Sequence, residues 1–153
     1  RSDLVPGTLE FEITESAAMD DPERSESVLR ELRALGIRIA LDDFGTGHSS
    51  LAQLSRFPIQ CLKIDRSLVA GLPYDRKNVV IASTVANLCR NLGLEMIGEG
   101  VESQAQAAFL LAQGCQQMQG FLFSPPVDAT RLSALLNAGV HPDWAISGQT
   151  QMH

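Results

Sequence analysis

The chain alternates between short apolar stretches and longer amphipathic stretches, and this alternation constrains its fold more than any other feature. Residues 8–14 alternate strictly, with Leu9, Phe11 and Ile13 on one side and polar residues on the other, which predicts a strand. Further strands are predicted at residues 37–41, 61–65, 94–100 and 118–123. Because a helical pattern follows each strand, the sequence predicts five β–α units in a parallel sheet with right-handed crossovers.

The amphipathic stretches carry start and stop signals for helices. In the first stretch, Asp21 suits the N-cap, Pro22 suits the first helical position and Gly36 suits the end. Its core-facing stripe is predicted to comprise Val28, Leu29, Leu32 and Leu35. Later helices are predicted at residues 51–57, from about Asp75 to Gly93, from Ser103 to Gly114, and from Asp128 onward. The apolar stripe of the helix from Asp75 comprises Val80, Ile81, Val85, Leu88 and Leu92.

Two architectures are compatible with this order of elements. A doubly wound sheet suits five β–α units and a length of 153 residues. A (β/α)₈ barrel normally needs about 250 residues, so this chain would supply only part of one. Length by itself favours the doubly wound sheet.

Polar residues at the predicted strand ends favour the barrel instead. They are Glu12, Asp42 with Asp43, Lys63 with Asp65, Glu99, and Gln119, which is placed in or just before the fifth strand. In a barrel all strand ends converge on one mouth, whereas a doubly wound sheet gathers its site at one switch point. One such residue is most simply a solvated turn residue, but a run at five strand ends predicts a shared site.

The acidic members of this set are Glu12, Asp42, Asp43 and Glu99, and no His or Cys accompanies them. Hard oxygen ligands suit Mg²⁺, Mn²⁺ or Ca²⁺ better than Zn²⁺. Two adjacent carboxylates repel each other unless a cation or solvent compensates them, and such a pair can reach two metal ions. The pattern therefore indicates a divalent-cation site of the kind used in phosphoryl chemistry.

Composition excludes several classes of function. The hydrophobic fraction of 44% and the charged fraction of 20% are typical of a soluble globular protein. A net charge of −6 argues against binding to a nucleic-acid polymer or to acidic lipid, and no apolar run has the length of a membrane span. The cysteines Cys61, Cys89 and Cys115 form no C-x-x-C pair, which predicts free buried thiols in a reducing cytoplasm.

Five motifs occur in a fixed order: LEFEITES at residues 9–16, LDDFGTGHSSL at 41–51, LKIDRSLV at 62–69, IGEGVES at 97–103 and QMQGFLFSPPV at 117–127. Together they resemble the EAL domain, a bacterial phosphodiesterase domain that opens the second messenger cyclic di-GMP. The resemblance runs from about Leu9 to Leu136. It implies a (β/α)₈ barrel with cyclic di-GMP across its mouth and two Mg²⁺ or Mn²⁺ ions, and linear pGpG as the product.

The resemblance also implies a set of metal ligands. Glu12, Asp42 and Asp43 correspond to metal-binding positions, with Asp42 able to serve both ions and Asp43 the second. Gln119 corresponds to a residue that holds a metal-bound water.

Catalytic and supporting roles are implied for four further residues. Glu99 resembles the essential glutamate of the family, a general base or metal organiser, and Lys63 would orient the attacking water and offset charge. Glu15 would anchor the loop at residues 43–50, and Glu102 would help to position neighbouring groups.

The chain departs from the family pattern in several places. The Glu-Ala-Leu segment and an Asn ligand are absent, and we expect both to lie upstream of Arg1. Residues 1–138 would then be the C-terminal part of the domain, and residues 139–153 an irregular tail. We therefore expect the isolated chain to be marginally stable or to self-associate, and to be inactive or nearly so. His48 replaces a Tyr of the family, and Pro125 replaces a Lys.

Two other functions stay open from the sequence. One is a non-catalytic module that binds cyclic di-GMP or regulates a partner. The other is a doubly wound phosphoacceptor domain, which also combines paired acids with a Lys but places the pair after its first strand. The resemblance further implies a homodimer of the complete domain, additional domains upstream and a cytoplasmic location.

Overall fold

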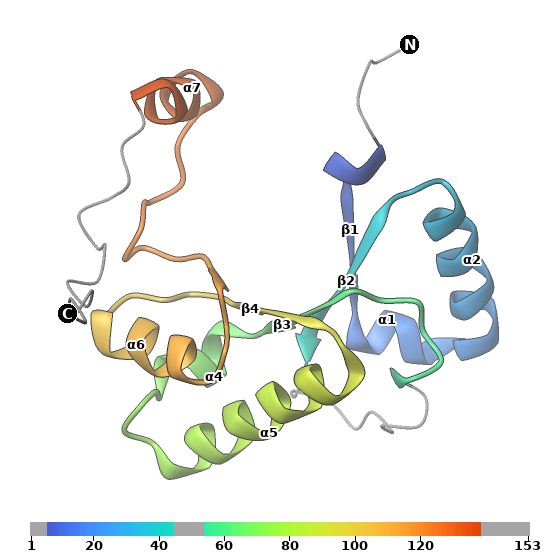
Figure 1. The fold of residues 1–153 in the computed structure, drawn as a ribbon, viewed down its shortest axis with the longest axis horizontal. Coiled ribbons are helices and arrows are strands. Elements are labelled where there is room, and N and C mark those ends of the chain that lie inside the picture. The colour runs from blue at the N-terminus through green and yellow to red at the C-terminus, as the bar shows by residue number, and fades with distance from the viewer. Residues whose placement is uncertain (1–5, 45–53, 139–153) are drawn as a thin grey trace, which may run out of the picture.

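The computed structural model describes residues 6–44 and 54–138, which form one parallel sheet with helices alongside it (Figure 1). The strands are β1 (Glu10–Thr14), β2 (Arg38–Phe44), β3 (Cys61–Ile64), β4 (Glu95–Gly98) and β5 (Gln117–Met118). Every pairing between neighbouring strands is parallel, as the alternation of patterns predicted.

The order of the strands decides between the two architectures. In the described part of the chain the strands lie in the sheet in sequence order, from β1 at one edge to β5 at the other. A doubly wound sheet instead reverses its direction at a switch point. Right-handed crossovers that all step the same way keep their helices on one face of the sheet. The fold is therefore part of a (β/α)₈ barrel, and the doubly wound alternative is wrong.

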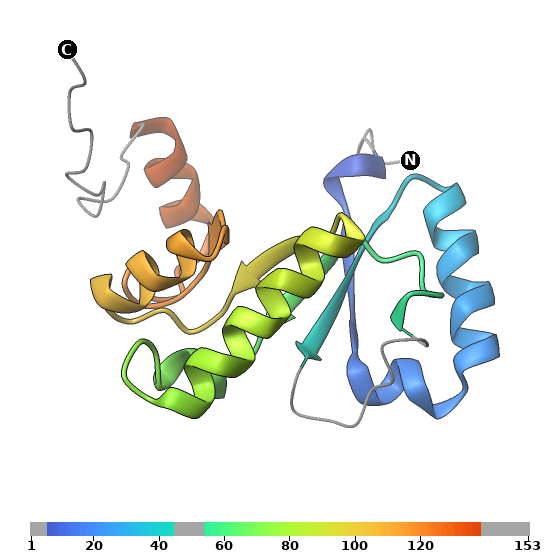
Figure 2. The same ribbon diagram turned by 60° about the horizontal axis from the view of Figure 1, so that its bottom comes forward.

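The helices lie outside the strands in the order of a barrel. They are the 3-10 helix η1 (Pro6–Thr8) and the α-helices α1 (Glu15–Asp20), α2 (Pro22–Ala34), α4 (Arg66–Ala70), α5 (Arg76–Leu92), α6 (Gln104–Ala112) and α7 (Ala129–Ala138). Helix α2 contacts β2, and α5 contacts both β3 and β4. Figure 2 shows α7 at the opposite end of the molecule from α2. Among the described residues, none of the helices combines the length and the apolar character that crossing a bilayer requires.

Capping contacts confirm four predicted helix starts. The side chains of Asp21, Asp75, Ser103 and Asp128 each accept a hydrogen bond from the backbone N–H three residues further on. Gly93 ends α5 in the left-handed conformation, with φ of 68°, which glycine adopts at little cost. Of the helix predicted at residues 51–57, residues 51–53 lie outside the described residues, and residues 54–57 form the end of a helical turn.

Two helices were not predicted, because each begins directly at a strand end. The Thr14 side chain caps α1 by accepting from the Ala17 N–H at 3.3 Å. The Asp65 carboxylate caps α4 by accepting from the Ser67 N–H at 2.9 Å. A strand that passes into a helix within one residue leaves no loop signal in the sequence.

The predicted apolar stripes are wider than the surfaces that the sheet covers. On α2, Leu29 is buried, whereas Val28 and Leu35 are 47% and 64% exposed. On α5, Val80 and Leu92 are likewise exposed. The predicted core was therefore wrong for these residues, since a helix that packs on one sheet buries only the centre of its stripe.

The fifth strand ends earlier than predicted, which corrects the position of Gln119. Gln119 follows β5 instead of preceding it, and residues 121–123 form a turn. The chain leaves the sheet there to wrap around Val101, whose N–H donates to the Gln119 carbonyl at 3.0 Å and whose carbonyl accepts from the Leu122 N–H at 2.9 Å.

The two faces of the sheet differ in chemistry. The side chains packed into the core include Ile39, Leu41, Leu62, Ile64 and Met96, all of them buried. The intervening positions on the same strands carry polar residues such as Arg38, Asp42 and Lys63. Alternation along a strand sends these two sets to opposite faces, so a polar interior lies inside an apolar shell.

All three cysteines are free and buried, as predicted. Burial raises the pKa of Cys61 to about 12 and the pKa of Cys89 to about 11. These side chains are therefore protonated thiols that pack as small apolar groups.

At the N-terminal ends of the strands, Arg38 ties several strands together. Its guanidinium pairs with Glu10 of β1 at 3.1 Å and with Glu95 of β4 at 2.7 Å. The hydrogen bond from Arg38 holds the pKa of Glu95 below its usual value, and the Gln117 amide of β5 donates to the same carboxylate at 2.8 Å. This polar contact closes the end of the sheet opposite to the acidic strand ends.

Replacing Gly120 by Ala should destabilise the chain strongly. Gly120 has φ of 154°, and an added Cβ would overlap the backbone N and O of Val101. We expect the free energy of unfolding to fall by about 3 kcal/mol, because both the backbone conformation and the space are lost. Urea unfolding measures the loss, and Gly7→Ala, whose Cβ would meet nothing within 4 Å, is the matched control. Equal stability of the two variants would contradict the prediction.

Candidate active site

A single buried ammonium holds the acidic strand ends together. Lys63 lies in β3, and only 4% of its side chain is exposed. Its Nζ is 2.7 Å from Glu12 Oε1, 2.6 Å from Glu99 Oε1 and 3.6 Å from Asp42 Oδ2. The structure therefore brings together residues from β1, β2 and β3 and from the end of β4, as the barrel hypothesis predicted.

The strand register explains why these side chains meet. Glu12 pairs with Ala40, two residues before Asp42, and Lys63 pairs with Ile97, two residues before Glu99. Residues two apart along a strand point to the same face of a sheet. The four strands β1 to β4 thus deliver their polar side chains to the interior of the barrel segment at nearly the same height.

Lys63 stays charged in this setting. Burial by itself lowers the pKa of a lysine, but the hydrogen bonds to Glu12 and Glu99 and the charges of Glu99 and Asp42 outweigh burial and raise the pKa of Lys63 above its usual value. Lys63 is therefore a fixed cation and cannot act as a general base.

Gln119 completes the arrangement from the end of β5. Its Nε2 donates to Glu99 Oε1 at 2.7 Å, the same oxygen that Lys63 contacts. The Gln119 backbone N–H donates to the Gly98 carbonyl at 2.9 Å, which places it beside the end of β4. Two donors on one oxygen fix the orientation of the Glu99 carboxylate and leave its second oxygen for another group.

Asp42 and Asp43 lie at an irregularity in β2. The register between β2 and β3 shifts between Leu41 and Phe44, and Asp43 has φ of 57°, a conformation that is uncommon for residues other than glycine. The Asp43 N–H donates to Asp42 Oδ1 at 2.9 Å. Regular pleating would send adjacent side chains to opposite faces, so this local distortion re-aims one carboxylate of the pair.

The environment of Asp43 disfavours a negative charge. Burial raises the pKa of Asp43, the neighbouring charges of Asp42 and Asp65 raise it further, and Lys63 opposes them. The adjacent anions are therefore only partly compensated by Lys63. This is the electrostatic condition under which an added cation binds favourably.

The two supporting residues differ in burial. Glu15 begins α1 and is 4% exposed, while the loop that it was predicted to anchor lies, from residue 45 on, outside the described residues. His48 lies in that same segment. Glu102 is exposed, and its backbone N–H donates to Gln106 Oε1 at 2.8 Å.

The donor set fits a divalent cation in its chemistry. All the acidic ligand atoms are carboxylate oxygens, which suit Mg²⁺ or Mn²⁺. Within residues 6–44 and 54–138, however, no three His, Cys, Asp or Glu side chains are arranged to hold a metal ion. Glu12 and Glu99 instead direct an oxygen at Lys63. The described residues thus supply carboxylate ligands that suit a divalent cation, but in this structure the Lys63 ammonium holds them in place.

A cavity of about 450 Å³ adjoins the cluster, and sequence reasoning missed most of its lining. It is bordered by Glu99 and Gln119, by Arg66 and Gly100, and by the apolar segment that follows β5. Arg66 and Gly100 stand inside the LKIDRSLV and IGEGVES motifs. Each lies two residues after the end of a strand, and this place was the signal that could have identified them.

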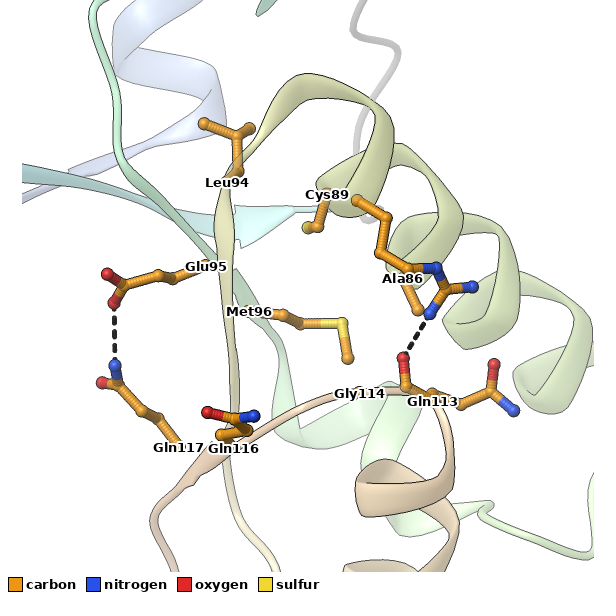
Figure 3. A pocket seen from close by; sticks show the side chains of 10 residues that line it. Ala86, Cys89, Leu94, Glu95, Met96, Gln113, Gly114, Gln116 and Gln117 are labelled. Atoms are coloured by element: carbon orange, nitrogen blue, oxygen red, sulfur yellow. Dashed lines mark hydrogen bonds between the residues drawn. The ribbon is translucent and has the colours of Figure 1, made fainter.

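A second cavity, of about 330 Å³, lies away from the acidic cluster (Figure 3). Its lining includes Glu95 and Gln117, the first residues of β4 and β5, which are joined by a hydrogen bond of 2.8 Å. Arg90 donates to the Gln113 carbonyl beside this cavity. Figure 3 shows Met96 and Cys89 among the lining side chains. This cavity therefore opens at the opposite ends of the strands from Glu99 and Gln119.

Replacing Lys63 by Met should destabilise the chain in a pH-dependent way. Without the ammonium, the carboxylates of Glu12, Asp42 and Glu99 repel one another at neutral pH, and we expect a loss of about 2 kcal/mol in EDTA. The loss should shrink below about pH 4.5, where carboxylates take up protons. Because folding raises the pKa of Lys63, the ammonium itself stays charged at neutral pH, and on the alkaline side its contribution is lost only above about pH 10.4.

Urea unfolding at several pH values measures this effect. Lys77→Met on the exposed start of α5 is the matched control, and it should change stability little at any pH. A Lys63→Met loss that is the same at pH 4 and pH 8 would show that the carboxylates do not depend on the ammonium.

Comparisons with known proteins agree with the fold and the motifs. The chain is 45% identical over 134 residues to the bifunctional diguanylate cyclase/cyclic di-GMP phosphodiesterase MucR of Pseudomonas aeruginosa, which covers 88% of this chain and 20% of MucR. A structure of the MucR phosphodiesterase in complex with cyclic di-GMP matches with a TM-score of 0.80, covering 83% of this chain and 51% of that chain.

Two further structures are similar. The EAL domain of Mycobacterium smegmatis DcpA has 40% identity and a TM-score of 0.85, over 91% of this chain and 62% of that chain. Klebsiella pneumoniae BlrP1 in complex with manganese and cyclic di-GMP has 35% identity and a TM-score of 0.74, over 80% of this chain and 31% of that chain.

The chain thus spans about a fifth of MucR and about half to three fifths of the MucR and DcpA structures. The family model of the EAL domain matches residues 1–126, which is most of the chain. By this match and by its similarity to MucR, the chain belongs to the EAL domain family.

Proposed function

We propose that this chain is the C-terminal part of an EAL domain that hydrolyses cyclic di-GMP to linear pGpG with divalent metal ions. The observation that carries the proposal is the cluster in which Lys63 contacts Glu12, Asp42 and Glu99. The cluster lies at the C-terminal ends of parallel strands, where barrel enzymes of this kind have their active sites. The phosphodiesterase name of MucR and its complex with cyclic di-GMP support the choice of substrate.

We assign the metal-binding role to Glu12, Asp42 and Asp43, with Gln119 acting through a water molecule. Bound Mg²⁺ or Mn²⁺ would supply Lewis acidity and neutralise the phosphodiester charge. The partial compensation of Asp42 and Asp43 supports this role, because a cation would relieve their repulsion. Manganese in the BlrP1 complex supports the choice of ion.

Glu99 and Lys63 would act on the attacking water. One Glu99 oxygen is held by Lys63 and Gln119, so the carboxylate is oriented and can accept a proton from water through its other oxygen. Lys63 remains protonated, so it serves as a hydrogen-bond donor that orients the water and offsets negative charge on the phosphate.

Two supporting roles complete the assignment. Buried Glu15 would hold the loop that follows Asp43, and Glu102 would position the segment after Glu99 through the contact of its backbone with Gln106. A homodimer of the complete domain and further domains in the same protein are part of this proposal, and the multidomain name of MucR supports the latter.

The structure supports the expectation that residues 1–153 do not work alone. In the described residues β1 and β5 are the edges of an open sheet, and Leu9 and Phe11 on or next to β1 are 42% and 49% exposed. An unpaired strand edge with apolar side chains is prone to association. We infer that other parts of the domain cover this edge and supply the remaining metal ligands.

The first test compares the isolated chain with the full-length protein that contains it. Each is incubated with cyclic di-GMP and Mn²⁺, and linear pGpG is quantified by chromatography. We expect turnover by the full-length protein, and little or none by residues 1–153, which should also associate in sedimentation experiments. Robust turnover by the isolated chain would overturn the inference that ligands are missing from it.

A second test removes the proposed base in the full-length protein. Glu99→Gln keeps the size of the side chain and its contact with Gln119 but cannot accept a proton, so kcat should fall by about 100- to 10,000-fold. Glu23→Gln on exposed α2 is the matched control and should keep full activity. Cyclic di-GMP binding without any turnover in the unmodified protein would replace the enzyme proposal by a binding-only role.

A further inference from the structure

The cavity of about 450 Å³ beside Glu99 combines apolar walls with a single cation. Its apolar lining comprises Phe121, Pro125, Pro126, Val127, Leu132 and Leu135. Its polar lining includes Glu99, Gln119 and Arg66. The volume is in the range of small-molecule sites, and the mixture of apolar walls and few polar groups is typical of them. A flat ring fits such walls better than a phosphate group, which would lie against apolar carbon and the Glu99 carboxylate.

Arg66 is placed at this cavity by its contact with Gly100. Arg66 is the first residue of α4, directly after the capping residue Asp65. A Cβ on Gly100 would overlap the Cβ and Cγ of Arg66, and Gly100 has φ of 64°. The absence of a side chain at Gly100 therefore lets the stem of Arg66 lie against the backbone that follows Glu99.

The Arg66 guanidinium is available to a ligand. In residues 6–44 and 54–138 it forms no hydrogen bond or ion pair, and only its charge acts on neighbouring Asp65. Lys63, the cation of the neighbouring cluster, is not among the residues that line this cavity. Position 125, another member of the lining, carries Pro and so adds no charge. Arg66 is thus the one lining residue that can donate several hydrogen bonds outward.

We propose that Arg66 recognises a guanine base of the cyclic dinucleotide in this cavity, by donating two hydrogen bonds to O6 and N7. The inference rests on the proposed function, because the ligand is the substrate of the same site. Guanine presents two acceptors on this edge, whereas adenine presents one acceptor and one donor. A guanidinium, which only donates, therefore favours guanine over adenine. Arg66 is on this view a specificity residue, and Glu99 and Lys63 carry the chemistry.

The test measures equilibrium binding by the full-length protein in Ca²⁺, an ion found with cyclic di-GMP in another BlrP1 complex. Calorimetry compares cyclic di-GMP with cyclic di-AMP for the unmodified protein, Arg66→Met and Arg66→Lys. We expect Arg66→Met to weaken cyclic di-GMP binding by about 10- to 100-fold and to change cyclic di-AMP binding little. Arg66→Lys should recover only part of the loss, because an ammonium lacks the paired donor geometry.

Arg76→Met is the matched control. Arg76 is also an exposed first residue of a helix directly after a capping Asp, but it does not line the cavity. It should leave binding of both dinucleotides unchanged, and the melting temperatures of the two Met variants should agree closely.

The outcomes separate this inference from the proposed function. Equal weakening of both dinucleotides by Arg66→Met would show contact with a phosphate and overturn base recognition. Unchanged cyclic di-GMP binding by Arg66→Met would also overturn base recognition by Arg66. In that case, turnover of cyclic di-GMP by the unmodified protein would still support the phosphodiesterase proposal. Binding without turnover in the unmodified protein would reject the phosphodiesterase and leave the Arg66 comparison valid. Failure of the unmodified protein to bind cyclic di-GMP would reject both.

Discussion

The organisation of the site depends on one buried ammonium. Lys63 reaches carboxylates that arrive from different strands, and it stays charged because these partners outweigh the cost of its burial. A buried cation without such partners would lose its proton, and the carboxylates without the cation would repel one another. Each side of the cluster thus needs the other, so the positions of the strand ends are coupled by charge as well as by backbone hydrogen bonds.

On the proposed function, the cluster also explains how an acidic domain could act on an anionic substrate. Lys63 neutralises only part of the negative charge of the carboxylates around it. Burial and the neighbouring charge of Asp42 disfavour the negative charge on Asp43. A site with excess oxygen ligands attracts divalent ions, and the ions then reverse the local sign of the potential. Arg66 lies at the other side of Glu99, beyond the cluster, where an arginine remains free to meet the ligand itself.

The periodic pattern predicted most of the scaffold correctly, and its failures have physical causes. The helix starts at Asp21, Asp75, Ser103 and Asp128 were predicted correctly, because capping and apolar spacing are local features of the sequence. Helices α1 and α4 were missed because their caps are also strand ends. Val28 and Val80 were assigned to the core because periodicity shows which side of a helix is apolar, but not how much of it another element covers.

For the site, the sequence by itself determined the chemistry: oxygen ligands and one lysine at successive strand ends, in motifs that resemble one family. Only the tertiary structure decided how they meet. Two of these contacts join segments that are distant in the chain: Lys63 and Gln119 share one Glu99 oxygen, and Arg66 contacts Gly100. The distortion at Asp43 depends on local backbone strain. Residue type and spacing follow from local order, whereas these contacts follow from register and curvature of the sheet, which no local pattern specifies.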